Sequence, residues 1–277
     1  MKTLYAADLD GTLLLPGAVL SDFSRSALSS LTSAGVLFTA ATARTPATVV
    51  NILEGSGANA PAAMMNGVLL YDLEKKKILS AELLSENTKK HLLSCAENNF
   101  AVSMVYTLSD GGLKVFYRTD GSELTQGFVS ARNKTPYKTW ETVESYPELL
   151  DNEIIYLAAI GSKEALSRLE ADVKKDTSLK TVLYREVNYE DVWVFEAFSA
   201  KASKAKAIRE SAKLVGAERI VAFGDNYNDL PLFEGADVSV AVANAVPEVI
   251  SAADHICKSN TEDGVVLWIA EDAGSSL

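Results

Sequence analysis

The sequence predicts an α/β fold, a doubly wound and mostly parallel sheet core with an inserted α+β domain. Near the start of the chain, apolar strands alternate with helices, which is the unit of parallel sheets. The same alternation returns after residue 202. Between these stretches, short strands follow one another with few crossover helices, a pattern typical of antiparallel pairs. We therefore expect a core at residues 1–82 and 191–277 and an inserted domain at residues 83–190.

The first strand is apolar from Leu4 and runs into two carboxylates, Asp8 and Asp10, before the turn at Gly11 and Thr12. In extended chain alternate side chains share a face, so both carboxylates are expected to point the same way. Neighbouring carboxylates repel each other unless a positive charge lies between them. Mg²⁺ prefers oxygen ligands and leaves room for a phosphate. The strand therefore predicts a magnesium and phosphate site, the alternative being an ordinary Asp-Gly turn.

Local signals predict the next elements of the core. Ser21 is a typical helix N-cap, Gly35 a typical stop, and Pro46 a typical first-turn residue. The expected elements are a helix between Ser21 and Gly35, a strand Val36–Ala41 that ends at Thr42, a helix from Pro46 to Leu53, a strand Ala62–Met65, and a hairpin of Val68–Asp72 and Lys77–Ser80.

The inserted domain is expected to hold three helices and five strands, read from their periodicity. In chain order they are a helix Ser85–Asn98, strands Ala101–Tyr106 and Leu113–Tyr117, a helix Glu123–Arg132, a strand Ile154–Ile160, a helix Lys163–Lys174, and strands Thr181–Tyr184 and Val192–Phe198. The returning core follows as a helix Lys204–Val215, a strand Arg219–Phe223, a short helix Asn228–Glu234, a strand Val238–Val242, a helix Pro247–Ala253, a strand His255–Cys257 and a helix Asp263–Ala270.

The composition excludes several classes of partner. The 277 residues are 48% hydrophobic and 23% charged, as expected of a globular protein. The formal net charge of −11 argues against nucleic acid and against anionic membranes, because both need basic surface. No apolar run approaches the eighteen or so residues of a membrane span. Cleavage of a signal peptide would remove Asp8 and Asp10, so none is expected.

The cysteines and histidines carry no motif. Cys95 and Cys257 lie far apart and predict neither a disulfide framework nor a zinc site, which favours a reducing cytoplasm. His91 and His255 have no partner pattern and are interpreted as structural or surface residues. A monomer is the expected state.

Ligands of a doubly wound sheet bind outside the carboxyl ends of its strands. The polar residues expected at that edge are Asp8, Asp10, Thr42, Lys204, Asp225, Asn228 and Asp229. Taken singly, each has an ordinary structural interpretation, such as a strand-end hydroxyl for Thr42. Together they suit phosphoryl transfer, in which Mg²⁺ and a lysine neutralise phosphate oxygens. One carboxylate can act as a nucleophile, and a second can donate and accept the proton.

These residues resemble the four motifs of the haloacid dehalogenase superfamily, in the order of its Cof-like type IIB branch. The matching residues are Asp8-x-Asp10-Gly11-Thr12, Thr42, Lys204 and Gly224-Asp225-x-x-Asn228-Asp229, together with Asn66-Gly67 and Asp263-Gly264-Val265. The resemblance covers nearly the whole chain. It implies a Rossmannoid core and an inserted cap domain that selects the substrate.

The resemblance also implies a role for each motif residue. Asp8 would be the nucleophile and Asp10 the general acid and base. Mg²⁺ would be held by Asp8, by the backbone carbonyl of Asp10, and by Asp225. The phosphate or substrate would be bound by Thr42, Lys204, Gly11, Asn66 and Asn228, while Asn228 and Asp229 would orient the metal ligands.

The sequence departs from the family pattern in three places. Ala43 stands where a glycine usually follows the threonine, and alanine disfavours positive φ. Ala205 replaces a common glycine after Lys204. Residues Ser199–Ala202 replace a usual Pro-x-Gly-Val loop, where Lys201 adds a charge. None of these changes removes a motif residue.

The expected function is a Mg²⁺-dependent phosphatase that hydrolyses a small phosphorylated metabolite, such as a sugar phosphate, through an aspartyl-phosphate intermediate. The alternatives are a phosphomutase or phosphotransferase of the same superfamily, and a binding protein that has lost catalysis. Asp10 argues against a phosphonatase. The insert residues Tyr106, Tyr117, Arg118 and Arg185 are interpreted as structural or surface residues, although each could face a substrate.

Overall fold

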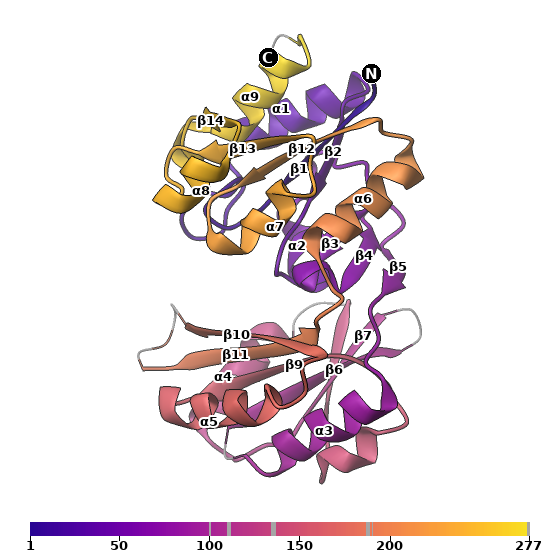
Figure 1. Cartoon of the computed structure of the whole chain (residues 1–277), viewed down its shortest axis with the longest axis vertical. Helices are drawn as coiled ribbons and strands as arrows, with labels where there is room; N and C mark the ends of the chain where they lie inside the picture. Colours follow the sequence, from indigo (N-terminus) through magenta and orange to yellow (C-terminus); the bar gives the residue numbers. More distant parts are fainter. Residues whose placement is uncertain (100, 110–111, 134–136, 187–188, 190, 276–277) are drawn as a thin grey trace. The chain divides into compact units, whose positions relative to one another are not determined.

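The chain forms two compact units in the computed structural model (Figure 1), which describes all residues except 100, 110–111, 134–136, 187–188, 190 and 276–277. The first unit comprises Met1–Ser80 and Ala202–Leu277, and the second comprises Ala81–Lys201. The chain returns to the first unit at Ala202, later than the expected residue 191. The reason is that the strand after that residue pairs within the sheet of the second unit.

A five-stranded parallel sheet forms the centre of the first unit, with strand order β14-β13-β12-β1-β2. Its strands are β1 (Thr3–Ala7), β2 (Leu37–Ala40), β12 (Arg219–Gly224), β13 (Val238–Val242) and β14 (His255–Cys257). In the register of the sheet, Ala7 of β1 lies opposite Ala40 of β2 and Phe223 of β12. The carboxyl ends of these three strands therefore lie side by side.

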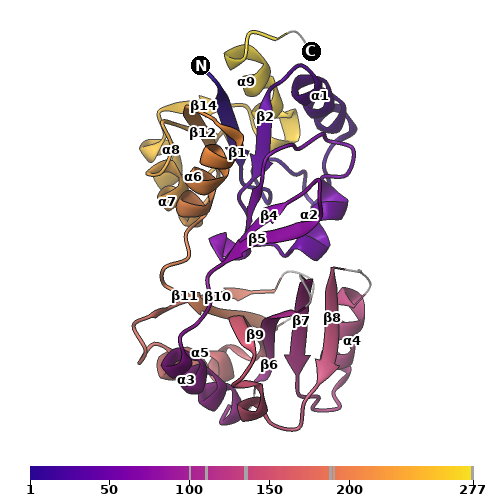
Figure 2. The ribbon, with the colours of Figure 1, turned by 90° about the vertical axis from the view of Figure 1, so that its right-hand side faces the viewer.

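Helices cover both faces of this sheet, as the side view in Figure 2 shows. One face carries α1 (Asp22–Ser33) and α9 (Gly264–Asp272), and the other carries α6 (Lys204–Val215), α7 (Leu230–Phe233) and α8 (Pro247–Ala252). Ser21 caps α1 as expected, because its side chain accepts the N–H of Ser24 at 2.9 Å. Layers on both faces confirm the doubly wound architecture predicted from the sequence.

A smaller sheet continues the first unit, with strand order β3-β4-β5. Its elements follow α2 (Pro46–Ile52) and are β3 (Ala62–Met64), the 3₁₀ turn η1 (Met65–Gly67), β4 (Leu69–Asp72) and β5 (Lys77–Ala81). A parallel bridge between Ala41 and Ala63 joins this sheet to the end of β2. The predicted hairpin is therefore present, and its tip at Lys75 and Lys76 is exposed.

The second unit contains a six-stranded sheet with order β10-β11-β9-β6-β7-β8, in which only the β7/β8 pair is parallel. Its strands are β6 (Val102–Ser109), β7 (Gly112–Tyr117), β8 (Lys138–Thr142), β9 (Glu153–Gly161), β10 (Leu179–Arg185) and β11 (Trp193–Ser199). Helices α3 (Glu86–Glu97) and α5 (Lys163–Val173) pack an apolar cluster against it, and α4 (Glu123–Arg132) lies between β7 and β8 in the chain. This is the α+β arrangement expected of the insert.

Strand β8 was not among the predicted strands. Trp140 is the one apolar side chain among its five residues, so the sequence shows no apolar–polar alternation. The buried position at Lys138 and the exposed ones at Thr139 and Glu141 are seen only in the structure. Pairing with β7 at every residue supplies the order that the local pattern does not indicate. A strand whose side chains are mostly polar is therefore stabilised by its neighbour in the sheet.

The four aromatic and cationic insert residues all have partners inside the second unit. Tyr106 packs edge-on against the ring of Tyr156, with centroids 5.8 Å apart, and Tyr117 packs in the same way on Trp140. The guanidinium of Arg118 lies 2.6 Å from the carboxylate of Glu97. Arg185 is exposed and lies 3.8 Å from the carboxylate of Asp191.

Within the described part of the chain, no helix has both the length and the apolar character needed to cross a bilayer.

The core of the second unit predicts a large stability effect for a buried leucine. Leu157 of β9 is fully buried in the apolar cluster, so Leu157→Ala should lower the free energy of unfolding by about 2–5 kcal/mol. Leu83 of the same unit is 47% exposed, and Leu83→Ala should change it by no more than about 0.5 kcal/mol. Urea unfolding followed by circular dichroism measures both. Equal effects of the two variants would contradict the assigned core.

Candidate active site

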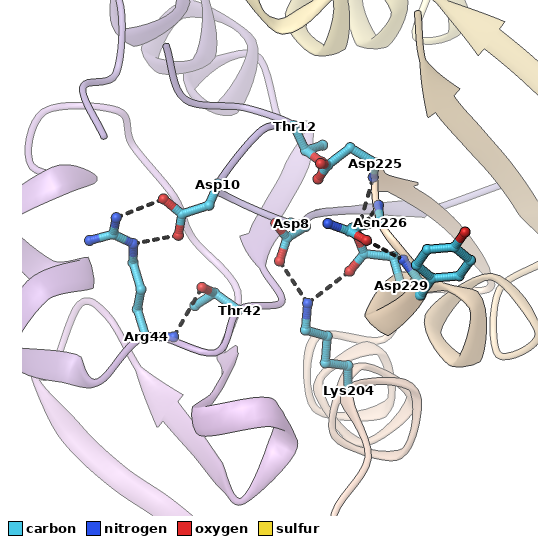
Figure 3. A network of polar contacts seen from close by, with 10 residues as sticks. Asp8, Asp10, Thr12, Thr42, Arg44, Lys204, Asp225, Asn226 and Asp229 are labelled. Carbon is cyan, nitrogen blue, oxygen red and sulfur yellow. Dashed lines mark hydrogen bonds and ion pairs between the residues drawn. The ribbon is translucent and has the colours of Figure 1, made fainter. Parts of the chain in front are cut away.

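Most of the predicted polar residues lie at the carboxyl ends of β1, β2 and β12 (Figure 3). Asp8 directly follows β1, and its N–H donates to the carbonyl of Phe223 at 3.0 Å. Thr42 comes after β2 and Asp225 after β12. Lys204, the first residue of α6, reaches the same place. The structure thus brings together residues that lie up to more than two hundred positions apart in the chain, as the strand-end argument predicted.

A buried lysine joins two buried carboxylates at the centre of this site. The Lys204 Nζ lies 2.6 Å from Asp8 Oδ1 and 2.8 Å from Asp229 Oδ1. Lys204 is 4% exposed, Asp8 5% and Asp229 0%. A buried charge is tolerated only when it is paired and hydrogen-bonded. We name these three residues the Lys204 cluster.

Asp229 also fixes the loop that follows β12. Its second oxygen, Oδ2, accepts the backbone N–H groups of Asp225 at 3.1 Å and Asn226 at 3.2 Å. Gly224 is required here, since a Cβ at that position would lie 2.5 Å from the Cβ of Asp229. Both oxygens of Asp229 are therefore occupied by protein donors, which leaves this residue to position its neighbours.

Asp225 lies beside two carboxylates of the Lys204 cluster, Asp8 and Asp229. The Thr12 hydroxyl donates to Asp225 Oδ1 at 2.7 Å. Gly11 leaves room for the other oxygen of Asp225, because a Cβ added at Gly11 would lie 2.4 Å from Asp225 Oδ2. Asp8, Asp225 and Asp229 each present an oxygen, and these oxygens all lie within 4.8 Å of one another. Because the oxygens of Asp229 already have donors, the oxygens best placed for a cation belong to Asp8 and Asp225.

Burial and like charge shift the pKa values at this site. Burial raises the pKa of the Asp8 carboxyl; Lys204 acts against this rise, and the charges of Asp229 and Asp225 add to it. Burial also raises the pKa of Asp225 to about 6, against the hydrogen bond from Thr12. Burial alone would lower the pKa of Lys204, but Asp8 and Asp229 raise it above its ordinary value. One ammonium thus faces three carboxylates, an imbalance that a divalent cation would relieve.

Asp10 does not join the Lys204 cluster. Strand β1 ends at Ala7, and the Leu9 carbonyl accepts N–H groups of the following turn, so the side-chain alternation of a strand does not continue to Asp10. Its carboxylate instead receives Nε and Nη2 of Arg44 at 2.6 and 2.7 Å. The expectation that Asp8 and Asp10 share one cation between them therefore does not describe this structure. Arg44 was not among the predicted site residues, although its place two residues after Thr42 in the loop after β2 was a signal.

The loops around Thr42 and Asn66 are tied together by their backbones. The Thr42 hydroxyl accepts the N–H of Arg44 at 3.1 Å, and the Thr42 carbonyl accepts the N–H of Asn66 at 3.0 Å. Asn66 takes a left-handed backbone at φ 60°, which asparagine tolerates. Gly67, at φ 85°, lies against the carbonyl of Ser203, the N-cap of α6. This contact links the Thr42 loop to the start of the helix that carries Lys204.

Asn228 is placed differently from the other predicted residues. It is exposed, and its side chain makes no hydrogen bond to any residue that the structure describes. Asn226, which the motif leaves unspecified, is the N-cap of this turn and accepts the N–H of Tyr227 at 2.8 Å.

Two further asparagines hold the turn after β1. Asn244 donates to the carbonyl of Gly11 at 2.7 Å, and Asn260 donates to the carbonyl of Leu14 at 2.7 Å. The N–H of Asn260 in turn donates to Asn244 Oδ1 at 2.9 Å. Their positions in the sequence gave no signal, because the link to the turn exists only in three dimensions. Asp263 of the late motif also links distant parts of the chain. Its carboxylate accepts hydrogen bonds from the hydroxyls of Ser21, the N-cap of α1, and Ser24, within α1.

A protein-family model for the haloacid dehalogenase-like hydrolases matches residues 5–269. The chain belongs to this family. The resemblance noted in the motifs is thereby confirmed, and the α/β fold agrees with a solved structure of a haloacid dehalogenase-like hydrolase from Bacteroides thetaiotaomicron. That structure aligns with a TM-score of 0.78 at 23% identity, over 98% of this chain and 100% of the other.

Curated relatives of similar length are phosphatases. The chain is 27% identical over 282 residues to the 5-amino-6-(5-phospho-D-ribitylamino)uracil phosphatase YwtE of Bacillus subtilis, covering 95% of this chain and 96% of the relative. It is 25% identical over 272 residues to the pyridoxal phosphate phosphatase YbhA of Escherichia coli, covering 96% and 97%. With the family match, these relatives make this haloacid dehalogenase-like hydrolase an enzyme of the phosphatase class.

Two departures from the family pattern are accommodated locally. Ala43 does not adopt a positive φ, so an alanine is not strained there. Ala205 lies in α6 against Gly235, at which an added Cβ would come within 2.4 Å of the alanine methyl group. Neither change disturbs the Lys204 cluster.

The close contact of Gly67 with Ser203 predicts that Gly67→Ala displaces the start of α6. The added Cβ would lie 2.3 Å from the Ser203 carbonyl, so Lys204 would move and phosphatase kcat/KM should fall about tenfold or more. Gly35→Ala is a matched control, because Gly35 also has a positive φ but no atom within 4 Å of the new Cβ. Activity on 4-nitrophenyl phosphate measures both, and equal activities would contradict the inferred role of this contact.

Proposed function

We propose that the protein is a Mg²⁺-dependent phosphatase that hydrolyses a small phosphorylated metabolite through an aspartyl-phosphate formed on Asp8. The observation that carries the proposal is the Lys204 cluster together with Asp225. It combines a buried carboxylate at a strand end, an ammonium within 2.6 Å of it and an excess of negative charge.

The donor set suits a hard divalent cation. Carboxylate oxygens of Asp8 and Asp225 and the backbone carbonyl of Asp10 would hold Mg²⁺, with Asp229 positioning the loop behind them. When bound, the ion would supply positive charge to neutralise the phosphate oxygens.

In the proposed first step, an oxygen of Asp8 attacks the phosphorus and the ester P–O bond breaks. Lys204 neutralises charge on the phosphoryl oxygens, because its ammonium lies beside the nucleophile. Thr42 and the backbone around Gly11 and Asn66 bind the remaining oxygens. Asp10 donates a proton to the departing oxygen, which leaves as an alcohol.

In the proposed second step, water attacks the phosphorus of the aspartyl-phosphate. Asp10, now ionised, takes the proton from this water, and inorganic phosphate leaves as the P–O bond to Asp8 breaks. Both carboxyl groups then return to their starting forms. The two steps use Asp8 as the nucleophile and Asp10 as the acid and base. The two carboxylates lie in different surroundings, because Asp8 contacts Lys204 and Asp10 contacts Arg44.

The substrate class is a phosphate monoester of a small molecule. YwtE and YbhA are named for two unlike phosphorylated compounds, so their names support the class and no single member of it. We propose that the second unit selects the substrate. We also propose that the enzyme works as a monomer in the reducing cytoplasm, which agrees with its two free thiols, Cys95 and Cys257.

Phosphate release from 4-nitrophenyl phosphate tests this proposal. The wild type should turn over with Mg²⁺, and excess EDTA should lower the rate at least about a hundredfold, because the carboxylates then repel the phosphate. Asp8→Asn with Mg²⁺ should lose about a thousandfold or more, since an amide is not a nucleophile.

Circular dichroism would show that Asp8→Asn keeps the fold. Full activity of that variant would refute the nucleophile assignment, and activity that survives chelation would refute the metal. Isomerisation of sugar phosphates without phosphate release would favour the mutase alternative. Binding without any turnover would favour the inactive binding protein.

A further inference from the structure

The ion pair between Arg44 and Asp10 has the geometry of a two-point clamp. The Nε of Arg44 donates to one carboxylate oxygen at 2.6 Å, and Nη2 donates to the other at 2.7 Å (Figure 3). Such paired bonds define the direction of the carboxylate as well as its distance. A lysine could supply charge but could not form the planar pair.

The backbone of Arg44 is held on both sides. Its N–H donates to the Thr42 hydroxyl at 3.1 Å, and its carbonyl accepts the N–H of Met65 at 3.0 Å. The guanidinium therefore extends from a backbone segment that is fixed to Thr42 on one side and to Met65 on the other. Its side chain is 25% exposed.

Asp10 itself has little other support. It lies beyond the end of β1, and its side chain is 54% exposed. Among the residues that the structure describes, the cationic side chain within ion-pair distance of the Asp10 carboxylate is that of Arg44. Without this partner the carboxylate would be free to sample several rotamers in solvent.

We propose that Arg44 is a positioning residue for Asp10, which restricts its carboxylate to one orientation at the edge of the site for its role as acid and base. The inference rests on the proposed function, because it takes Asp10 as the acid and base. Proton transfer depends on alignment within hydrogen-bond reach. A partly exposed ion pair contributes little to folding, so its removal should affect activity far more than stability.

Two aryl esters distinguish this role from a structural one. The value of kcat/KM reports the steps up to departure of the leaving group. Phenol is a worse leaving group than 4-nitrophenol, so its departure depends more on proton donation by the general acid. Arg44→Ala should therefore lower kcat/KM about tenfold or more for phenyl phosphate and less than about threefold for 4-nitrophenyl phosphate. Arg44→Lys should recover part of the loss.

A double-mutant cycle tests whether Arg44 acts through Asp10. Asp10→Asn should lower kcat/KM for phenyl phosphate by about 10²–10⁴-fold. In that background Arg44→Ala should cost less than about twofold more, since the group it positions is gone. A further large loss would mean that Arg44 binds the substrate directly, and this would overturn the proposal.

Arg219 provides the matched control. It forms a similar two-point pair with Asp272, at 2.6 and 3.1 Å, at the start of β12, and Arg219→Ala should leave the ratio between the two esters unchanged. If Arg44→Ala is as active as the wild type while Asp10→Asn loses activity, the positioning role of Arg44 is refuted and the acid–base role of Asp10 stands. An unchanged Asp10→Asn enzyme would instead refute the acid–base assignment in the proposed function.

Discussion

One buried ammonium group organises the site and, with it, much of the first unit. Lys204 contacts Asp8 from the N-terminal stretch of the chain and Asp229 from the C-terminal stretch. These stretches belong to one unit although the whole second unit is inserted between them. Removal of the lysine would leave two buried carboxylates facing each other, which is strongly unfavourable. The chemistry and the assembly of the unit thus depend on the same interaction.

Glycines permit the close approaches that this interaction needs. Gly11, Gly67 and Gly224 each lie so near a site residue or its cap that an added Cβ would fall within 2.3 to 2.5 Å of it. Each glycine stands next to a polar element of the site, either in sequence or in space. The acids can converge because the backbone between them occupies very little volume.

The sequence predicted the features that depend on local pattern. The apolar run before Asp8, the cap at Ser21 and the first-turn position of Lys204 all indicated elements that the structure contains. Ligands of a doubly wound sheet lie outside the carboxyl ends of its strands, which is why Asp8, Thr42, Lys204, Asp225 and Asp229 could be expected together.

Features that depend on long-range pairing were missed. Strand β8 forms through its pairing with β7. The boundary at residue 190 was placed too early, because β11 pairs with β9 and β10 in the sheet of the second unit. Asn244 and Asn260 hold the turn after β1 from positions more than two hundred residues away. The separate environment of Asp10 also went unpredicted, because the exact end of a strand is set by hydrogen bonds that no local pattern specifies.

The central claim is that phosphate passes through Asp8. Rapid quenching of the wild type during turnover, followed by borohydride reduction and peptide mass spectrometry, tests it most directly, because reduction converts an aspartyl-phosphate into homoserine. We expect homoserine at position 8, in wild-type enzyme exposed to substrate and not in enzyme without it. Steady phosphate release with no modified residue, or with modification at another carboxylate, would contradict the account.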